Sequence, residues 1–346
     1  MSGARTQPGA QACALFDLEP LPDATFGALL WLHRDGDLHA AIAALEARPD
    51  ALPAALYAHD GLLLIPHLDA IAQAPELLLR LSRLFGAEVE DYRQTFTARG
   101  NIHPTVPQIF VVSNRPPTGR QPPPRPQPPL DAAGKLPIRF PHRRGWHTDQ
   151  SYRRPPPDVS LFYAVQPAPR EQAQTLYANG IAAYAALAPA LRARIEGLYG
   201  LHVMPGLGRS EQAVRAGETP ATLLPHQRAQ RQPVVRVHPV TGARALFLCE
   251  AGQMDWVDGP FAGMQPGPDG DGARLLYELM AHYTDPRFSY AHAWQRGDLI
   301  VYDNRTLIHA ATWFDAQAHE RVMWRTTVAG NPGAEYAGER KSWLAG

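Results

Sequence analysis

The sequence is short of cysteine, of net charge and of long apolar runs. Its two cysteines, Cys13 and Cys249, are too few for a disulfide framework and indicate a reducing compartment. The 33 basic residues balance 33 acidic ones, so charge gives no reason to expect nucleic acid or an anionic membrane as a partner. No apolar run approaches the roughly 20 residues of a membrane span, and residues 1–14 lack the apolar core of a signal peptide. We therefore expect a cytoplasmic protein.

Proline, in contrast, is about twice as common as usual, with 35 residues. Eight of them fall within 116–129. Because proline lacks a backbone donor, this stretch is neither a helix nor a central strand, and we expect an extended insertion loop over about 115–141. This loop is expected to be either a lid over a site or a surface insertion without function. No repeat or linker is visible elsewhere, so we expect a single domain over 1–346.

Apolar periodicity predicts many short strands and a few helices. Helical spacing marks residues 38–47, 69–85, about 180–196 and 272–284, and Asn179 is the predicted cap of the helix over about 180–196. Strand patterns occur at 61–65, 108–112, 159–165, 174–177, 234–238, 243–249, 288–294, 298–302, 306–312 and 320–329. The stretch 205–232 is rich in glycine and polar residues and predicts a loop or lid. This mixture favours a mixed α/β, mainly β fold, with a double-stranded β-helix (jelly-roll) core and flanking helices.

One tripeptide has the spacing of a metal site. His147 and Asp149 are two residues apart, so in an extended segment both side chains point to the same face. His309, on the strand predicted over 306–312, is a candidate third ligand. Two imidazoles and one carboxylate form the ligand set of non-haem Fe(II) oxygenases, which leaves iron positions open for a co-substrate and O₂. Taken alone, the tripeptide is better explained by an ordinary hydrogen-bonded His–Asp pair in a loop.

The last predicted strand carries two arginines on one face. Strand alternation places Arg321 and Arg325 on one side, and the other side, with Trp324 and Val328, is mostly apolar. If the apolar side packs against outer helices, both arginines face the interior, where an unpaired guanidinium is costly. Interior arginines would then require anionic partners, and the fork of arginine suits carboxylate, phosphate or sulfonate groups. An edge strand with solvated or internally paired arginines is the alternative.

Five separated blocks occur in an order that carries a family resemblance. They are 146–149 (WHTD), 174–184 (QTLYANGIAAY), 238–247 (HPVTGARALF), 297–309 (GDLIVYDNRTLIH) and 321–327 (RVMWRTT). This pattern resembles the taurine/2-oxoglutarate dioxygenase (TauD/TfdA) family over about residues 60–330, which we take as the core of the domain.

The resemblance implies a ferrous site with 2-oxoglutarate as co-substrate and O₂ as oxidant. Fe(II) would be held by His147, Asp149 and His309. The distal carboxylate of 2-oxoglutarate would meet Arg321 and the hydroxyl of Thr175. The remaining arginine, Arg325, would lie near the C1 carboxylate or near an anionic group of the substrate, and these two placements stay open.

The resemblance also implies a substrate class. His103 matches a family position that helps to hold the substrate anion, whereas the aromatic residue found three positions later in family members is Val106 here, which argues against taurine itself. The expected reaction is hydroxylation of a small anionic organic molecule, with release of succinate and CO₂. Sulfonates, sulfate esters, aryloxyalkanoates and amino-acid-like molecules all fit.

Two other functions compete with a dioxygenase for the same residues. A jelly-roll sensor that binds metal and 2-oxoglutarate without turnover would use the same residues and differ only in forming no succinate. A zinc hydrolase would need a general base near the metal and would give Arg321 and Arg325 no role. The sequence leaves assembly into a homo-oligomer open.

Overall fold

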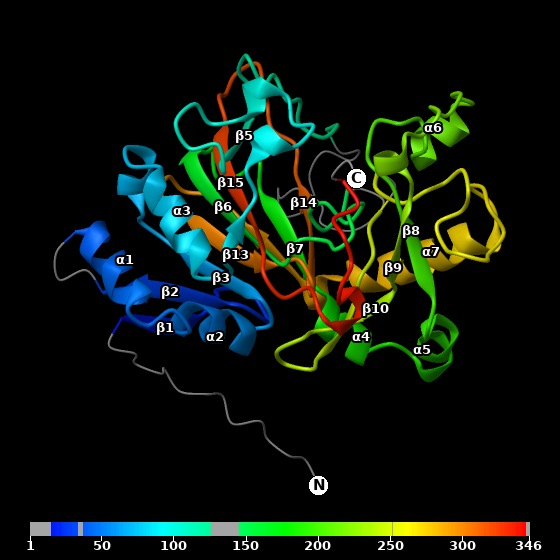
Figure 1. Cartoon of the computed structure of the whole chain (residues 1–346), viewed down its shortest axis with the longest axis horizontal. Coiled ribbons are helices and arrows are strands. Elements are labelled where there is room, and N and C mark those ends of the chain that lie inside the picture. Colours follow the sequence, from blue (N-terminus) through cyan, green and yellow to red (C-terminus); the bar gives the residue numbers. More distant parts are fainter. Residues whose placement is uncertain (1–14, 34–36, 126–144, 251, 344–346) are drawn as a thin grey trace, which may run out of the picture.

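The computed structural model describes residues 15–33, 37–125, 145–250 and 252–343. Residues 126–141 of the proline-rich insertion, and Cys13, lie outside this part of the chain. The fold is mixed α/β and rich in sheet, as the sequence predicts (Figure 1). None of the helices in the described ranges is both long and apolar enough to span a bilayer.

The largest sheet has eight strands. Seven of them follow the order β1-β2-β3-β13-β6-β15-β4, and β5 pairs with β15 next to the end of that path. All their pairings are antiparallel except that of β2 with β3. The strands are β1 (Phe16–Pro20), β2 (Ala28–Leu32), β3 (Leu62–Ile65), β4 (Glu88–Val89), β5 (Phe110–Ser113), β6 (Val159–Gln166), β13 (Leu299–Asp303) and β15 (Val322–Ala329).

Three smaller sheets complete the strands. The sheet that matters for the site has the order β12-β7-β14, with β7 in the centre and both neighbours antiparallel to it. The predicted hairpin around Thr241-Gly242 is present as β10 and β11. These strands are β7 (Thr175–Asn179), β8 (Tyr199–His202), β9 (Gln230–Pro233), β10 (Val235–Val237), β11 (Arg244–Leu246), β12 (Ser289–His292) and β14 (Leu307–Ala311).

The helices lie outside the sheets (Figure 1). They are α1 (Leu38–Glu46), α2 (Ala51–Ala58), α3 (Glu76–Arg83), α4 (Gly180–Ala185), α5 (Pro189–Ile195), α6 (Glu211–Arg215) and α7 (Asp271–Tyr283). The prediction for 205–232 is wrong in part, because α6 forms there, with the side chain of Ser210 capping it at the amide of Ala213.

Two predicted helices are each interrupted at a proline. The stretch 69–85 consists of a 3₁₀ turn (Asp69–Ala72) and then α3, because Pro75 lacks the amide that a continuous helix needs. The stretch 180–196 divides in the same way into α4 and α5, and α5 begins at Pro189. The predicted cap is confirmed, since Asn179 accepts hydrogen bonds from the amides of the first turn of α4.

Strand alternation divides the core into layers. On β3, Leu63 and Ile65 pack with α1, α2 and α3 on the outer face of the large sheet, whereas Leu62 and Leu64 turn inward. The inward side chains meet those of the small sheet, among them Tyr177 of β7. The opposite face of the small sheet packs against α4 and α7. The inner faces of the two sheets therefore enclose the space into which the candidate site points.

The predicted faces of β15 are correct. Trp324 and Val328 belong to the outer core layer under α1, α2 and α3, whereas Met323 belongs to the layer between the sheets. Arg321 and Arg325 share the inward face and line the main cavity. The outer packing of Trp324 and Val328 is thus what turns the two arginines inward.

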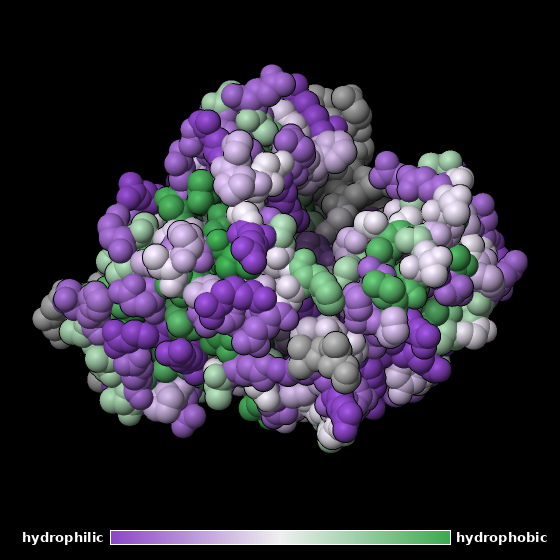
Figure 2. Space-filling view, turned by 45° about the horizontal axis from the view of Figure 1, so that its top comes forward, coloured by the Kyte–Doolittle hydropathy of each residue, from purple (hydrophilic) through white to green (hydrophobic). Residues whose placement is uncertain are grey.

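Polar and charged residues are spread over the face of the molecule seen in Figure 2, and apolar residues form separate groups among them. The large apolar side chains that are exposed in the described residues are Trp31, Phe96, Tyr199, Leu224, Val237 and Val240. They come from scattered elements and do not define a docking surface.

Candidate active site

The three predicted metal ligands meet in space. His147 pairs with His309 of β14 through two backbone hydrogen bonds, from His147 N to His309 O at 2.9 Å and from His309 N to His147 O at 2.7 Å. The ligand atoms of His147, Asp149 and His309 all lie within 4.8 Å of one another. This two-residue ladder is the physical reason that a tripeptide and a strand distant in sequence form one site.

The first ligand, His147, is oriented by its own turn. Its Nδ1 lies 2.6 Å from the carbonyl oxygen of Gly145, so that nitrogen carries the proton and Nε2 keeps its lone pair for a metal. Glu250 holds this turn, because its Oε2 accepts hydrogen bonds from the amides of Gly145 at 2.6 Å and Trp146 at 3.3 Å. Trp146 itself is buried in the core behind the small sheet, as a packing role predicts.

The carboxylate of Asp149 is held ionised. Its Oδ2 accepts from the hydroxyls of Tyr302 at 2.6 Å and Ser160 at 2.7 Å. Its Oδ1 contacts the guanidinium of Arg325 and lies 3.9 Å from Nε2 of His309. Burial opposes ionisation, but the charge of Arg325 and the neighbouring histidines hold the pKa of Asp149 well below its usual range.

The imidazole of His309 is neutral at neutral pH. Burial, with the adjacent His147, lowers the pKa of His309 to about 3. Its ring packs against those of Tyr302, with ring centres 4.9 Å apart, and Tyr177, at 6.0 Å. Burial lowers the pKa of His147 as well. Two neutral imidazoles beside one ionised carboxylate are the protonation states that a divalent metal requires, so the donor set fits such an ion.

A cavity of about 400 Å³ opens beside these residues, within the range usual for small-molecule sites. It is lined by both histidines, by Thr175 and Arg321, which the family resemblance assigns to the co-substrate, and by Arg325, for which the resemblance leaves co-substrate and substrate open. The described lining residues are Val112, Ser113, Asn114, Arg120, Gln121, Pro122, Pro123, Pro124, Gly145, His147, Phe162, Ala173, Thr175, Tyr302, His309, Ala311, Thr312, Phe314, Arg321 and Arg325.

Two of the cavity arginines differ in their pairing. Arg325 pairs with Asp149, which raises the pKa of Arg325 against the effect of burial. Arg321 is 8% exposed, and no acidic side chain among the described residues forms an ion pair with it. Burial and the charge of Arg120 lower the pKa of Arg321 to about 10. A buried guanidinium without a carboxylate is a binding group for an anion from outside the protein.

Thr175 is prepared to donate a hydrogen bond. Its Oγ1 accepts from the indole Nε1 of Trp294 at 2.9 Å. An indole nitrogen only donates, so the hydroxyl proton of Thr175 stays available for a group in the cavity. Thr175 and Arg321 therefore offer donors to the same space.

His103 is not brought to this cavity. Its Nδ1 lies 3.2 Å from the amide nitrogen of Val106, and its ring packs edge-on against Trp324 at 4.7 Å. Trp324 belongs to the outer face of β15, opposite to Arg325. His103 is absent from the described residues that line the cavity, so a role in holding the substrate anion finds no geometric support.

Several side chains that contact the candidate metal ligands or line the cavity are not among the predicted site residues. Tyr302 follows from the alternation of β13, since it shares an inward face with Ile300. Ser160 and Glu250 act through hydrogen bonds that no local pattern reveals. Arg120 lies in the proline-rich insertion, where periodicity gives no information on the direction of side chains.

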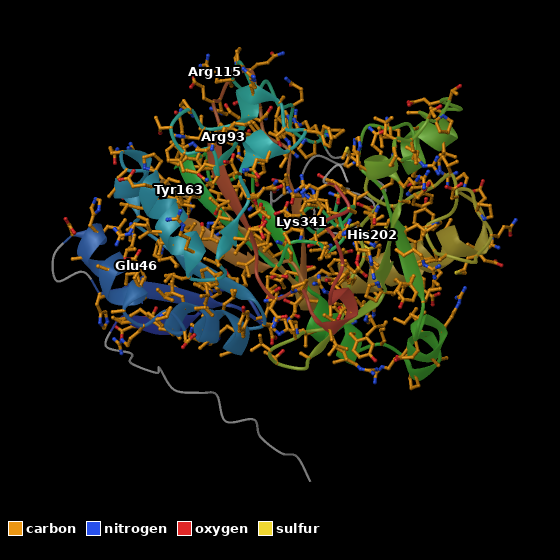
Figure 3. All side chains as sticks on the ribbon, viewed as in Figure 1. Glu46, Arg93, Arg115, Tyr163, His202 and Lys341 are labelled. Carbon is orange, nitrogen blue, oxygen red and sulfur yellow. The ribbon has the colours of Figure 1, made fainter. Side chains whose placement is uncertain are left out.

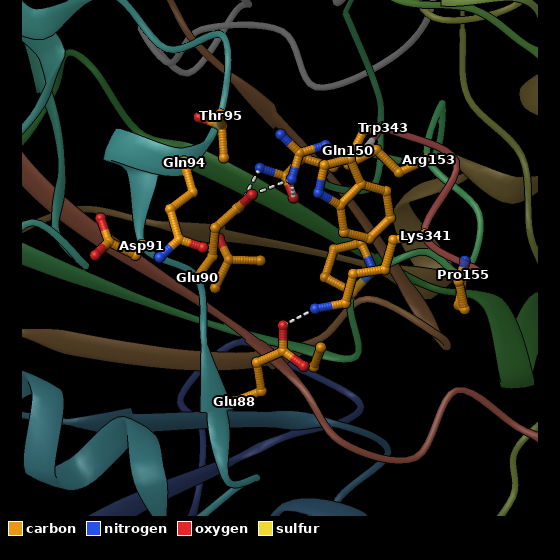
Figure 4. A pocket seen from close by; sticks show the side chains of 13 residues that line it. Glu88, Glu90, Asp91, Gln94, Thr95, Gln150, Arg153, Pro155, Lys341 and Trp343 are labelled. Carbon is orange, nitrogen blue, oxygen red and sulfur yellow. Dashed lines mark hydrogen bonds and ion pairs between the residues drawn. The ribbon is translucent and has the colours of Figure 1, made fainter. Parts of the chain in front are cut away.

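A second cavity, of about 80 Å³, is lined by residues that include Glu88, Glu90, Arg153, Lys341 and Trp343 (Figure 4). Its acidic groups have partners: Glu88 pairs with Lys341, and Glu90 pairs with Arg153. Trp343 covers the guanidinium of Arg153 at 4.8 Å. The third acidic lining residue, Asp91, pairs with Arg93, so each acidic side chain that lines this cavity in the described residues has a basic partner.

The fold brings together two histidines and one carboxylate that could hold a metal ion, beside a cavity lined by arginines. The family model described as "Taurine catabolism dioxygenase TauD, TfdA family" matches residues 17–327, and the chain belongs to that family.

Three relatives whose names describe alpha-ketoglutarate-dependent dioxygenases are similar to part of this chain. The chain is 32% identical over 197 residues to an (S)-phenoxypropionate/alpha-ketoglutarate-dioxygenase of Sphingobium herbicidovorans, covering 56% of this chain and 64% of the relative. It is 30% identical over 188 residues to an alpha-ketoglutarate-dependent 2,4-dichlorophenoxyacetate dioxygenase of Burkholderia sp., covering 53% and 57%. An alpha-ketoglutarate-dependent sulfate ester dioxygenase of Pseudomonas putida is 30% identical, covering 54% and 59%. The chain thus matches less than two thirds of the length of each of these relatives.

Solved structures show the same fold. A taurine dioxygenase from Burkholderia xenovorans superposes with a TM-score of 0.63 at 22% identity, covering 98% of this chain and 96% of that one. The structure of AAD-2 in complex with Mn(II) and N-oxalylglycine superposes with a TM-score of 0.61 at 25% identity, covering 91% and 98%.

Proposed function

We propose that this protein is an Fe(II)- and 2-oxoglutarate-dependent dioxygenase that hydroxylates a small anionic organic substrate and releases succinate and CO₂. The observation that carries the proposal is the meeting of His147, Asp149 and His309 beside a cavity in which Arg321 forms no ion pair with a carboxylate of the described residues. Related proteins named for alpha-ketoglutarate (2-oxoglutarate) support the class of co-substrate.

The metal ligands would be His147, Asp149 and His309, each through the atom that faces the cavity. When bound, the ferrous ion supplies the redox chemistry that couples oxidative decarboxylation of 2-oxoglutarate by O₂ to hydroxylation of a C–H bond. The protein supplies orientation and charge. Tyr302 and Ser160 fix one carboxylate oxygen of Asp149 by hydrogen bonds and leave Oδ1 toward the histidines.

The co-substrate would be held by Arg321 and Thr175 at its distal carboxylate. A guanidinium without an ion-pair partner in the described part of the chain and an available hydroxyl proton match the acceptors of a carboxylate. Arg325 is placed beside the metal ligands by its contact with Asp149, which favours the C1 carboxylate of 2-oxoglutarate as its partner over a more distant substrate group. Arg321, Thr175 and Arg325 would thus orient the two carboxylates of 2-oxoglutarate next to the metal.

The finer structural expectations remain part of the proposal. The opposed inner faces of the two sheets support a double-stranded β-helix core, within one domain over 1–346. A cytoplasmic location rests on the sequence alone, and a homo-oligomer stays open. A sensor that binds 2-oxoglutarate without turnover is the competing function, and none of the relatives named above supports it.

The test is Fe(II)-dependent release of succinate from 2-oxoglutarate, measured with a panel of aryloxyalkanoates, sulfonates and sulfate esters. We expect a substrate from this panel to stimulate succinate formation, and His147→Ala or Asp149→Ala to abolish it. Binding of 2-oxoglutarate without substrate-stimulated succinate would favour the sensor. Unchanged turnover in both ligand variants would refute the metal site.

A further inference from the structure

The cavity contains a third arginine that neither the metal nor the co-substrate requires. Arg120 comes from the proline-rich insertion, and its side chain lines the cavity together with Gln121 and the run Pro122–Pro124. The described half of the insertion is therefore a wall of the site.

The loop that presents Arg120 is tied to the sheet at both ends. The amide of Arg120 donates to the carbonyl of Ser113 at 2.8 Å, which closes the loop at the end of β5. Gly119 has a φ of 59°, and its amide donates to the carbonyl of Arg115 at 2.8 Å, a turn that glycine accepts readily. Arg120 is thus held by backbone bonds and is not simply part of a surface chain.

Asn114 links this loop to the co-substrate arginine. Its Oδ1 accepts from the backbone amide of Arg321 at 2.8 Å, and its Nδ2 donates to the carbonyls of Ala316 and His319 at 3.0 and 2.9 Å. Further along, Arg125 lies over the ring of Trp313 at 4.9 Å. The segment 120–125 is consequently held at its start by the hydrogen bond of Arg120 to Ser113 and at its end by the contact of Arg125 with Trp313.

The charge of the cavity is unbalanced. Three arginines line it, Asp149 pairs with one of them, and no acidic residue is among the described lining residues. Burial and the charge of Arg325 lower the pKa of Arg120, and Arg120 in turn lowers that of Arg321. A divalent metal and dianionic 2-oxoglutarate cancel each other, so an excess of positive charge remains for a further anion.

The rest of the wall is apolar. Phe162, Phe314, Ala173 and Ala311 face the same cavity as Arg120, and so does the run Pro122–Pro124. Such a surface suits the body of an aromatic or aliphatic molecule, whereas a small polar molecule would leave it in contact with water.

We propose that Arg120 binds the anionic group of the primary substrate, and that this substrate is a carboxylate, sulfonate or sulfate carried on an apolar body. The inference rests on the proposed function, and it gives the insertion a role in specificity. In the proposed function Arg321 and Thr175 hold the co-substrate, and Arg325 lies at Asp149, so Arg120 is the remaining cation among the described lining residues of the cavity.

The test compares anionic probes with neutral counterparts of the same shape. Fe(II)- and 2-oxoglutarate-loaded protein is titrated anaerobically, by calorimetry, with phenoxyacetate and 2-phenoxyethanol, and with benzenesulfonate and benzenesulfonamide. We expect the wild type to prefer the anion of each pair by about tenfold or more, because an arginine pairs strongly with these groups. Arg120→Gln should remove that preference, and Arg120→Lys should keep part of it.

The control is Arg115→Gln, in the same loop. Arg115 pairs with Glu320 and lies at the edge of the molecule (Figure 3), and it does not line the cavity. This variant should bind all four probes as the wild type does. In Arg120→Gln the dissociation constant of 2-oxoglutarate should stay within about twofold of the wild type.

Three results would overturn the role of Arg120: no preference for anions in the wild type, a preference kept in Arg120→Gln, or an equal loss of 2-oxoglutarate binding in that variant. The last would make Arg120 a co-substrate residue. Failure of the wild type to bind 2-oxoglutarate at all is seen before any probe is added, and it would refute the proposed function itself.

Discussion

Arg325 contacts the same carboxylate oxygen of Asp149 that faces Nε2 of His309. The guanidinium therefore occupies one side of the position in which a metal would sit. This contact favours the ionised carboxylate, but the positive charge of Arg325 also opposes a divalent cation nearby. Removal of the charge of Arg325 should therefore change the affinity for the metal and the affinity for 2-oxoglutarate in different ways, and mutation can separate them.

Arg325→Gln should weaken 2-oxoglutarate while leaving the metal in place. We expect the dissociation constant of 2-oxoglutarate to rise about tenfold or more, since a charge-assisted contact to an anion is lost. Mn(II) affinity should be unchanged or higher, because Tyr302 and Ser160 still hold Asp149. Mn(II) binding followed by electron paramagnetic resonance, beside calorimetry with 2-oxoglutarate, gives both values. Loss of the metal itself would mean that Arg325 is needed to position Asp149.

Arg321→Met should weaken the binding of 2-oxoglutarate and should not reduce the stability of the ligand-free protein. The buried guanidinium has no ion pair among the described residues, so its removal relieves a desolvation cost, and we expect the ligand-free protein to melt at the same or a higher temperature. The affinity for 2-oxoglutarate should fall about 10- to 100-fold. Thermal unfolding with and without 2-oxoglutarate measures both effects. A large loss of stability in the free protein together with unchanged co-substrate affinity would contradict the assignment of Arg321.

Glu250→Gln should weaken metal binding through the turn that carries His147. Glu250 accepts from the amides of Gly145 and Trp146, and Gly145 orients the imidazole. We expect the Mn(II) dissociation constant to rise about tenfold, as is common when groups that orient a ligand are altered. The matched control is Glu46→Gln on α1, where the carboxylate pairs with Arg80 far from the site (Figure 3). Equal metal affinity in the two variants would show that Glu250 does not position His147 for the metal.

His202 should make the protein less stable as the pH falls. It is fully buried on β8 (Figure 3), and burial lowers its pKa from 6.5 to about 3. Between these values the unfolded chain binds a proton that the folded chain does not, so stability decreases as the pH falls through this range. From pH 7.5 to pH 5 this one histidine should remove about 2 kcal/mol.

His202→Gln isolates that contribution. The variant should lose less stability than the wild type over the same pH interval, even if it is less stable at pH 7.5. Urea unfolding at several pH values gives the comparison, and His39→Gln, at an exposed position, is the control. Parallel pH curves for wild type and His202→Gln would show that His202 is not the titrating group.

The parts of the fold that the sequence predicted are those governed by strand alternation. The two faces of β15, the pairing of His147 with Asp149 and the cap at Asn179 follow from local spacing. The helix predicted over 69–85 failed at Pro75, where a missing amide overrides a continuous apolar pattern.

The site was less predictable where it depends on contacts between distant segments. Arg120 enters the cavity because the chain folds back on Ser113, and the proline-rich composition carries no signal for that return. His103 was assigned to the cavity from a family position, but packing on Trp324 draws it to the outer face of β15. Neither outcome has a local cause that one sequence could show.

The central claim is that His147, Asp149 and His309 bind Fe(II) to which 2-oxoglutarate adds. Anaerobic titration of the Fe(II)-loaded protein with 2-oxoglutarate, followed by the metal-to-ligand absorption band, tests it most directly. We predict a band that saturates at one 2-oxoglutarate per chain, that is absent in His147→Ala and Asp149→Ala, and that needs more 2-oxoglutarate in Arg321→Met. A wild type without the band, or an unchanged band in either ligand variant, would contradict the account.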